Sequence, residues 1–150
     1  MRRRTFVTLL GSAVAAAPFT ALAQQPNRIR RVAWLGLGRP DPQSPYVEAL
    51  RAGLRDFGWI EGRNLTLSLY WATGRDDMEA KGRELLASDP EVIVTQELMV
   101  YAMRELKPKT PVVFGFSGDP VDGKLVESYS RPGGNMTGMT YLALDLVGKR

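Results

Sequence analysis

The sequence predicts an α/β fold with a doubly wound parallel sheet, because short apolar runs alternate with segments of helical periodicity. The apolar runs are typical of strands and lie at residues 31–38, 65–71, 91–95, 111–116 and 136–142. The helical segments lie between them, at residues 44–57, 76–87 and 98–106. Most connections between these segments are only a few residues long, which favours βαβ units with helices flanking the sheet.

The first strand and the first helix carry clear local signals. Residues 31–38 are a mostly apolar run that ends in glycine, as expected for a strand covered on both faces. Ser44 followed by Pro45 indicates a helix start, because serine caps free N–H groups and proline fits the first helical position. The helix is expected to place four apolar side chains on one face: Val47, Leu50, Leu54 and Phe57. Gly58 is expected to end it.

The second strand and the second helix are predicted by weaker sequence patterns. In residues 65–71 leucines alternate with Thr66, Ser68 and Tyr70, so we expect this strand near an edge of the sheet. Asp76 is expected to open the second helix, with Glu79 three residues later completing a capping pair.

The first residues predict an export signal. Three arginines at positions 2–4 precede an uncharged apolar run at 6–22, and Ala21, Leu22 and Ala23 form a small-x-small cleavage site. Arg3 and Arg4 also fit the twin-arginine pattern, and an ordinary export signal with a basic head is the alternative. We therefore expect a signal peptide at 1–23, a linker at 24–30, a domain at 31–150 and a periplasmic location.

Composition restricts the function. Loss of the signal removes three arginines and no acid, so the net charge falls from +4 to +1 and gives no argument for nucleic-acid binding. The chain contains no cysteine and no histidine, which excludes disulfides and thiolate metal sites and removes the commonest general base. Gly36 and Gly38 lack the third glycine of a dinucleotide fingerprint. We therefore predict no catalytic residue, no metal site and no cofactor.

Ligands of open parallel sheets bind at the carboxyl ends of the strands, near the point where strand order reverses. Three loops lie at such ends, at residues 38–44, 95–97 and 116–120. In the last of them Ser117 and Asp119 offer a hydroxyl and a carboxylate. The alternative is that these residues only form turns, since glycine, proline, aspartate and serine are common in ordinary loops.

Several separated motifs resemble one family. They are the helix PYVEALRAGL at 45–54, the turn GWIEGRN at 58–64, GDPV at 118–121 and SRPGGNMTG at 130–138. Together they are similar to the N-terminal part of ABC transporter substrate-binding proteins, whose best-known relatives are linked to tryptophan and tyrosine uptake. The resemblance implies a periplasmic binding protein that closes two lobes, each a flavodoxin-like sheet, around a small molecule and delivers it to a permease. This chain would be the first lobe, with no second lobe in its sequence, in a protein expected to be a monomer.

By position, the resemblance implies a set of ligand-facing residues at the strand ends. They are Gly38, Ser44, Thr95, Gln96, Ser117, Asp119 and Tyr141. Many relatives carry small residues just after the third strand, where they can hold a carboxylate. Here Gln96 and Glu97 stand there, and Glu97 would repel a carboxylate unless its side chain is turned outward. The identity of the solute stays open.

Two other classes of function remain open from the sequence. A ligand-sensing domain of a signalling system would use the same kind of lobe. An exported enzyme on a flavodoxin-like sheet would need Asp119 as a base, without help from histidine or cysteine.

Overall fold

The computed structural model describes residues 28–141. In chain order, its elements are β1 (Arg30–Leu37), α1 (Pro45–Asp56), β2 (Leu65–Ala72), the 3₁₀ helix η2 (Arg75–Asp77), α2 (Met78–Ala87), β3 (Val92–Gln96), α3 (Met99–Leu106), β4 (Val112–Phe116) and β5 (Met136–Thr140). The predicted signal peptide, most of the predicted linker and the end of the chain after residue 141 lie outside the described residues.

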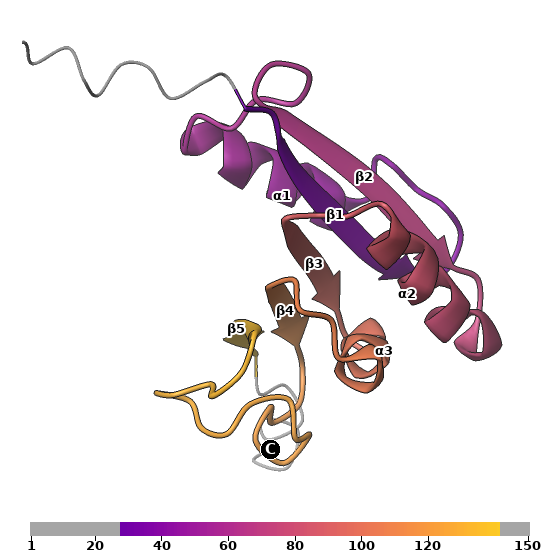
Figure 1. Cartoon of the computed structure of the whole chain (residues 1–150), viewed down its shortest axis with the longest axis vertical. Coiled ribbons are helices and arrows are strands. Elements are labelled where there is room, and N and C mark those ends of the chain that lie inside the picture. Colours follow the sequence, from indigo (N-terminus) through magenta and orange to yellow (C-terminus); the bar gives the residue numbers. More distant parts are fainter. Residues whose placement is uncertain (1–27, 142–150) are drawn as a thin grey trace, which may run out of the picture.

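The five strands form one parallel sheet in the order β2-β1-β3-β4-β5 (Figure 1). From β1 the chain first steps outward to β2, then returns past β1 to β3 and continues in the other direction to β4 and β5. The direction of winding therefore reverses between β1 and β3. The predicted doubly wound α/β fold is confirmed, and β2 lies at an edge as its alternating pattern predicted.

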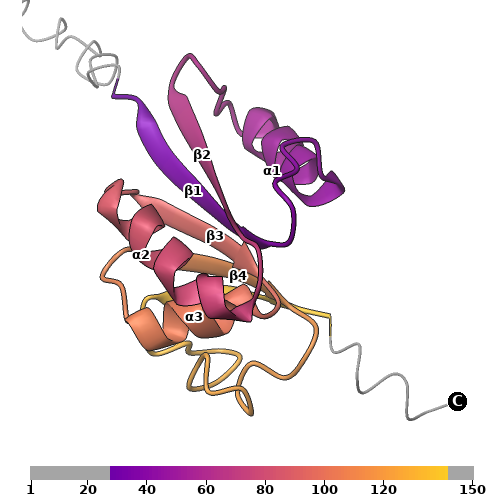
Figure 2. The ribbon, with the colours of Figure 1, turned by 90° about the vertical axis from the view of Figure 1, so that its right-hand side faces the viewer.

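The helices divide between the two faces of the sheet, with α1 on one side and α2 and α3 on the other (Figure 2). The side of α2 and α3 holds the larger core, where Leu35, Ile93 and Phe114 pack against Leu85 and Met103. The side of α1 holds a smaller cluster of buried residues, made of Trp34, Val47 and Leu67. Both faces of β1 are therefore packed, as its continuous apolar run indicated.

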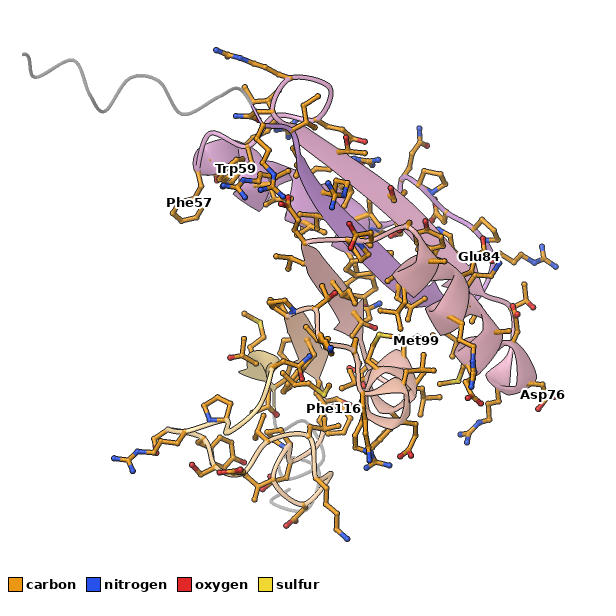
Figure 3. The ribbon with its side chains drawn as sticks, viewed as in Figure 1. Phe57, Trp59, Asp76, Glu84, Met99 and Phe116 are labelled. Atoms are coloured by element: carbon orange, nitrogen blue, oxygen red, sulfur yellow. The ribbon has the colours of Figure 1, made fainter. Side chains whose placement is uncertain are left out.

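Helix α1 begins as the sequence predicted but is shorter at its end. The Ser44 hydroxyl oxygen accepts a hydrogen bond from the Val47 N–H at 3.3 Å, and Pro45 occupies the first turn. The prediction that Phe57 packs on the buried face is wrong. Phe57 follows the last helical residue, and its side chain is 85% exposed and points away from the sheet (Figure 3). Gly58 then turns the chain with a φ of +82°.

The predicted start of α2 at Asp76 is wrong. Residues 75–77 form a single 3₁₀ turn, and α2 begins at Met78 without a side-chain cap. Asp77, and not Asp76, forms the local hydrogen bonds. Its carboxylate accepts one hydrogen bond from the Thr73 backbone N–H at 3.0 Å and one from the Thr73 hydroxyl at 3.3 Å. Glu79 pairs with Arg83 one turn later instead of reaching back to a cap. A fixed turn before the helix thus replaces the expected capping pair.

The glycine-rich segment between β4 and β5 is irregular, and two of its glycines have clear structural reasons. Gly133 adopts a φ of +82°, where other residues are strained. Gly138 pairs with Phe114 in the β4–β5 register, and a Cβ there would lie 2.0 Å from the Phe114 carbonyl oxygen. Strand β5 can therefore join the sheet only because residue 138 has no side chain.

Candidate ligand-binding site

The candidate site lies where β1, β3 and β4 end. These strands are neighbours in the sheet, and the loops that follow them lie at the same edge because all three are parallel (Figure 2). The winding reverses between β1 and β3, and ligands of doubly wound sheets bind beyond the carboxyl ends of the strands near such a point. We call this the carboxyl edge and define it by Gly38, residues 95–97 and Ser117.

Gly38 presents backbone to open space. It has a φ of +111°, and a Cβ built on it would meet no atom within 4 Å. Its N–H donates to the carbonyl of Ala72 at 2.7 Å, which ties the end of β1 to the end of β2. The predicted position of Gly38 at the rim therefore agrees with a backbone that a ligand can approach.

Ser44 and Thr95 use their hydroxyl groups inside the protein. Ser44 is buried and caps α1, as described above. Thr95 is 1% exposed, and its hydroxyl donates to the Leu35 carbonyl in β1 at 3.0 Å. These bonds hold α1 and the β1–β3 pair in position behind the edge. A ligand contact for either side chain stays a prediction.

Glu97 and Ser117 join the ends of β3 and β4. Glu97 has a φ of +49°, an uncommon conformation for a residue with a side chain, and its N–H donates to the Gly115 carbonyl at 2.9 Å. The Ser117 hydroxyl donates to the Glu97 carboxylate at 2.7 Å. Gln96 and Glu97 are both half-buried at this end of β3. The sequence pointed to Ser117 and Gln96, but it treated Glu97 only as an obstacle to anions and missed its bond to Ser117.

Asp119 is engaged in a turn. One carboxylate oxygen accepts from the Val121 N–H at 2.7 Å and from the Asp122 N–H at 3.2 Å. The Val121 N–H lowers the pKa of the Asp119 carboxyl below its ordinary value, with further lowering from Asp122 and Tyr129. The side chain thus fixes the backbone after β4, which is the turn role that the sequence left open beside a ligand contact.

Tyr141 lies at the edge through the end of β5. Its N–H donates to the Phe116 carbonyl at 3.0 Å, and the neighbouring Thr140 hydroxyl donates to the Gly118 carbonyl at 2.6 Å. The Tyr141 hydroxyl lies 3.0 Å from the place where a Cβ on Gly115 would stand, so the ring extends over that glycine. Tyr141 is 55% exposed and offers an aromatic face and a hydroxyl over Gly115.

Hollows elsewhere on the molecule do not coincide with the carboxyl edge. One of about 640 Å³ lies between α3 and the loop after β4, lined by Tyr101, Arg104 and Lys124 among others. Another of about 570 Å³ lies beside α1 and is mostly apolar, lined by Leu54, Val94 and others. Neither hollow is lined by Gly38, residues 95–97 or Ser117.

The geometry at this edge suits binding. Backbone at Gly38, the amide of Gln96, the carboxylate of Glu97 and the hydroxyl of Tyr141 can donate or accept hydrogen bonds. Among residues 28–141, no group of three or more histidine, cysteine, aspartate or glutamate side chains could hold a metal ion. Within the same range, no helix is long and apolar enough to cross a membrane.

The family model described as ABC transporter substrate binding protein matches residues 41–147, which is more than half of the chain. The chain belongs to this family. The match includes α1, the ends of β3 and β4 and the whole segment leading to β5. The family resemblance inferred from the sequence motifs is therefore confirmed. No curated protein sequence matches this chain.

Solved structures share this substrate-binding fold. A conserved domain protein from Vibrio cholerae has a TM-score of 0.68 and 25% identity, over 80% of this chain and 43% of that one. The ABC domain from Streptococcus pneumonia in complex with L-Trp has a TM-score of 0.66 and 16% identity, over 75% and 38%. A ligand-free, open substrate-binding protein with adhesive properties from Clostridium difficile has a TM-score of 0.61 and 16% identity, over 79% and 43%. This chain matches about two fifths of their length.

Proposed function

We propose that this chain is the first lobe of a periplasmic solute-binding protein that captures a small, amino-acid-like organic molecule and delivers it to an ABC permease. The observation that carries the proposal is the family match over residues 41–147, on a parallel sheet whose winding reverses between β1 and β3. The Streptococcus structure, which holds L-Trp, supports an amino-acid-like solute for a protein of this fold.

A second lobe would supply the opposite wall of the cleft. The chain matches only 38–43% of the length of the similar structures, which is consistent with one lobe of two. A single open wall buries only part of a small molecule, so we expect the lobe alone to bind weakly. Closure of two lobes would stabilise the bound form by the difference in affinity between the closed and open states.

The proposed location and partners follow from the sequence and the family. Export by the segment at 1–23, through the general or the twin-arginine route, would place the protein in the periplasm beside an inner-membrane permease. We expect a monomer that binds a solute and no nucleic acid.

Catalysis through Asp119 is poorly supported. A general base works best when its pKa lies near the working pH, but the turn N–H groups lower the pKa of Asp119. Those N–H groups also occupy one of its two oxygens. Asp119 is therefore better suited to shaping the loop after β4 than to removing a proton.

Saturation-transfer NMR tests solute binding, because it detects weak complexes. The full 150-residue chain would be expressed and purified. It would then be mixed with a panel of amino acids, amines, organic acids and sugars. We expect at least one amino-acid-like solute to bind, with no chemical change over a day. If no member of the panel binds, or if a solute is converted by the wild type but not by Asp119→Asn, the proposed function is wrong.

A further inference from the structure

Within the part of the chain that the structure describes, residues 28–141, the carboxyl edge carries a negative charge on Glu97 that no ion pair neutralises. Within residues 28–141, ion pairs join many acidic side chains to an arginine or lysine, but none involves Glu97. Arg39, in the exposed loop after β1, has no ion pair with Glu97 in this part of the chain. Glu97 is nevertheless half-buried and held in place by Ser117.

The hydrogen bond from Ser117 fixes the carboxylate without satisfying it. Ser117 donates to one oxygen, Oε2, at 2.7 Å. An ionised carboxylate has about four acceptor positions on its two oxygens, so further donors can still bind. The left-handed backbone at Glu97, with φ +49°, and the N–H bond to Gly115 fix the base of the side chain. The carboxylate is therefore a positioned acceptor at the end of β3.

The amino end of α3 does not cancel this charge. Helix α3 begins at Met99 with no side-chain cap, so its first N–H groups give this end a partial positive charge. A helix terminus is equivalent to about half an elementary charge, whereas a carboxylate carries a full one. The sum next to Glu97 is thus negative, and a carboxylate group of a ligand would be repelled there.

We propose that Glu97, positioned by Ser117, recognises a protonated nitrogen of the solute, so that this lobe prefers solutes with an amine or amidine at the β3 end of the cleft. This inference deepens the proposed function and rests on it. A charge-assisted hydrogen bond from an ammonium or amidinium group to the free acceptor positions would supply the missing partner. Solutes with only a carboxylate to present at this position would be disfavoured.

Glu97→Gln separates this role from a purely structural one. The glutamine amide oxygen can still accept the bond from Ser117, so the connection between β3 and β4 is kept while the charge is lost. Glu84→Gln is the matched control, because Glu84 lies on the outer side of α2, where it pairs with Lys81 (Figure 3). Both variants remove one negative charge, but only one removes it from the edge.

The measurement uses amines and carboxylates built on similar carbon skeletons. The compounds are tryptamine and 3-indolepropionate, 2-phenylethylamine and 3-phenylpropionate, and 1,5-diaminopentane and glutarate. Dissociation constants come from NMR titration of the wild type and both variants. We expect the wild type to bind amines over carboxylates, and Glu97→Gln to weaken amine binding by about tenfold or more, as expected for a hydrogen bond to a charged group. Glu84→Gln should bind like the wild type.

The outcomes separate this inference from the proposed function. If the wild type binds the carboxylates as tightly as the amines, or if Glu97→Gln binds the amines as tightly as Glu84→Gln does, the role of Glu97 is wrong. Solute binding would then still stand. If neither these compounds nor the wider panel bind, solute binding itself is contradicted, and the inference is wrong with it.

Discussion

The two edges of the sheet treat their charged residues differently. At the amino edge, where β1 and β3 begin, the Glu91 carboxylate contacts Arg28 at 2.6 Å and Arg30 at 3.4 Å and accepts from the Arg31 N–H at 3.0 Å. At the carboxyl edge, where β3 ends, Glu97 has a serine hydroxyl as its hydrogen-bond partner.

Under the proposed function, this difference separates an edge that stabilises the fold from an edge that would meet the solute. The amino edge brings opposite charges together, so its polar groups are satisfied by the protein. At the carboxyl edge, Thr95 and Ser44 form hydrogen bonds inside the protein, whereas Glu97 forms no ion pair within residues 28–141 and Gly38 has open space where a Cβ would stand. Under the proposed function, the acceptor positions that Ser117 leaves free on the Glu97 carboxylate are the ones that a solute can satisfy.

The largest expected effect comes from Gly138→Ala, which lies in the middle of the β4–β5 pair, away from the charges of the amino edge. The new Cβ would lie 2.0 Å from the Phe114 carbonyl oxygen, so β5 must shift away from β4. We expect a loss of roughly 2–3 kcal/mol in the free energy of unfolding, typical of overpacking. Urea denaturation measures it. Gly134→Ala is the control, because a Cβ there meets no atom within 4 Å, and equal losses in the two variants would contradict the packing argument.

A smaller effect is expected for Thr95→Val, which keeps the shape of the side chain and removes its hydrogen bond to Leu35. The hydroxyl is buried, so we expect a loss of about 1 kcal/mol in the free energy of unfolding. Solute binding should change little, because the hydroxyl is directed into the sheet. Thr66→Val, on an exposed position of β2, serves as the control. A loss of solute binding in stable Thr95→Val protein would show that Thr95 touches the ligand after all.

Next in size is Ser117→Ala, which keeps the charge of Glu97 but removes the group that positions it. We expect amine binding to weaken about two- to fivefold, a smaller effect than that of Glu97→Gln, because the charge of Glu97 stays and only its position becomes less fixed. NMR titration with tryptamine measures the change. Ser128→Ala is the control, because this hydroxyl bonds to Arg131 within the same long loop and, among residues 28–141, to no other residue. If the two variants bind tryptamine equally well, Ser117 does not position the carboxylate.

The smallest effect concerns the amino edge in acid. The Arg31 N–H lowers the pKa of Glu91 below its ordinary value of 4.5, helped by the charges of Arg28, Arg30 and Arg31. A lowered pKa in the folded state means that the stabilisation is complete above pH 4.5 and is lost as the pH falls through the lowered pKa. Thermal unfolding between pH 6 and 3 should therefore show a steeper acid loss in the wild type than in Glu91→Gln. Parallel curves would show that this edge does not stabilise through its charges.

The sequence predicted the fold well because its signals are local and repeated. The apolar run of β1, the alternation in β2 and the serine and proline at the start of α1 each specify one element without reference to distant residues. The errors at Phe57 and Asp76 occurred at helix ends, where a single competing turn decides the boundary. At the start of α2, the Asp77 carboxylate accepts hydrogen bonds from Thr73. The spacing of residues in the sequence does not show that Asp77 and not Asp76 forms this turn.

The candidate site could be predicted only in outline. The sequence located the loops, since parallel strands must end at one edge, and it named Gly38 and Ser117 there. It could not tell which polar side chains the fold would use for itself. Thr95 and Asp119 form internal hydrogen bonds, with partners fixed by strand pairing for Thr95 and by turn geometry for Asp119. Glu97 is held in position by Ser117, which lies 20 residues away in the chain, so the sequence alone did not connect the two.

The most direct test of the binding account is a map of backbone chemical shifts. The labelled chain would be titrated with a solute that saturation transfer has shown to bind. The account predicts that the largest shifts fall on Gly38, Gln96, Glu97 and Ser117, at the carboxyl edge. Shifts concentrated in the apolar hollow beside α1, around Leu54 and Val94, with the strand ends unchanged, would contradict it.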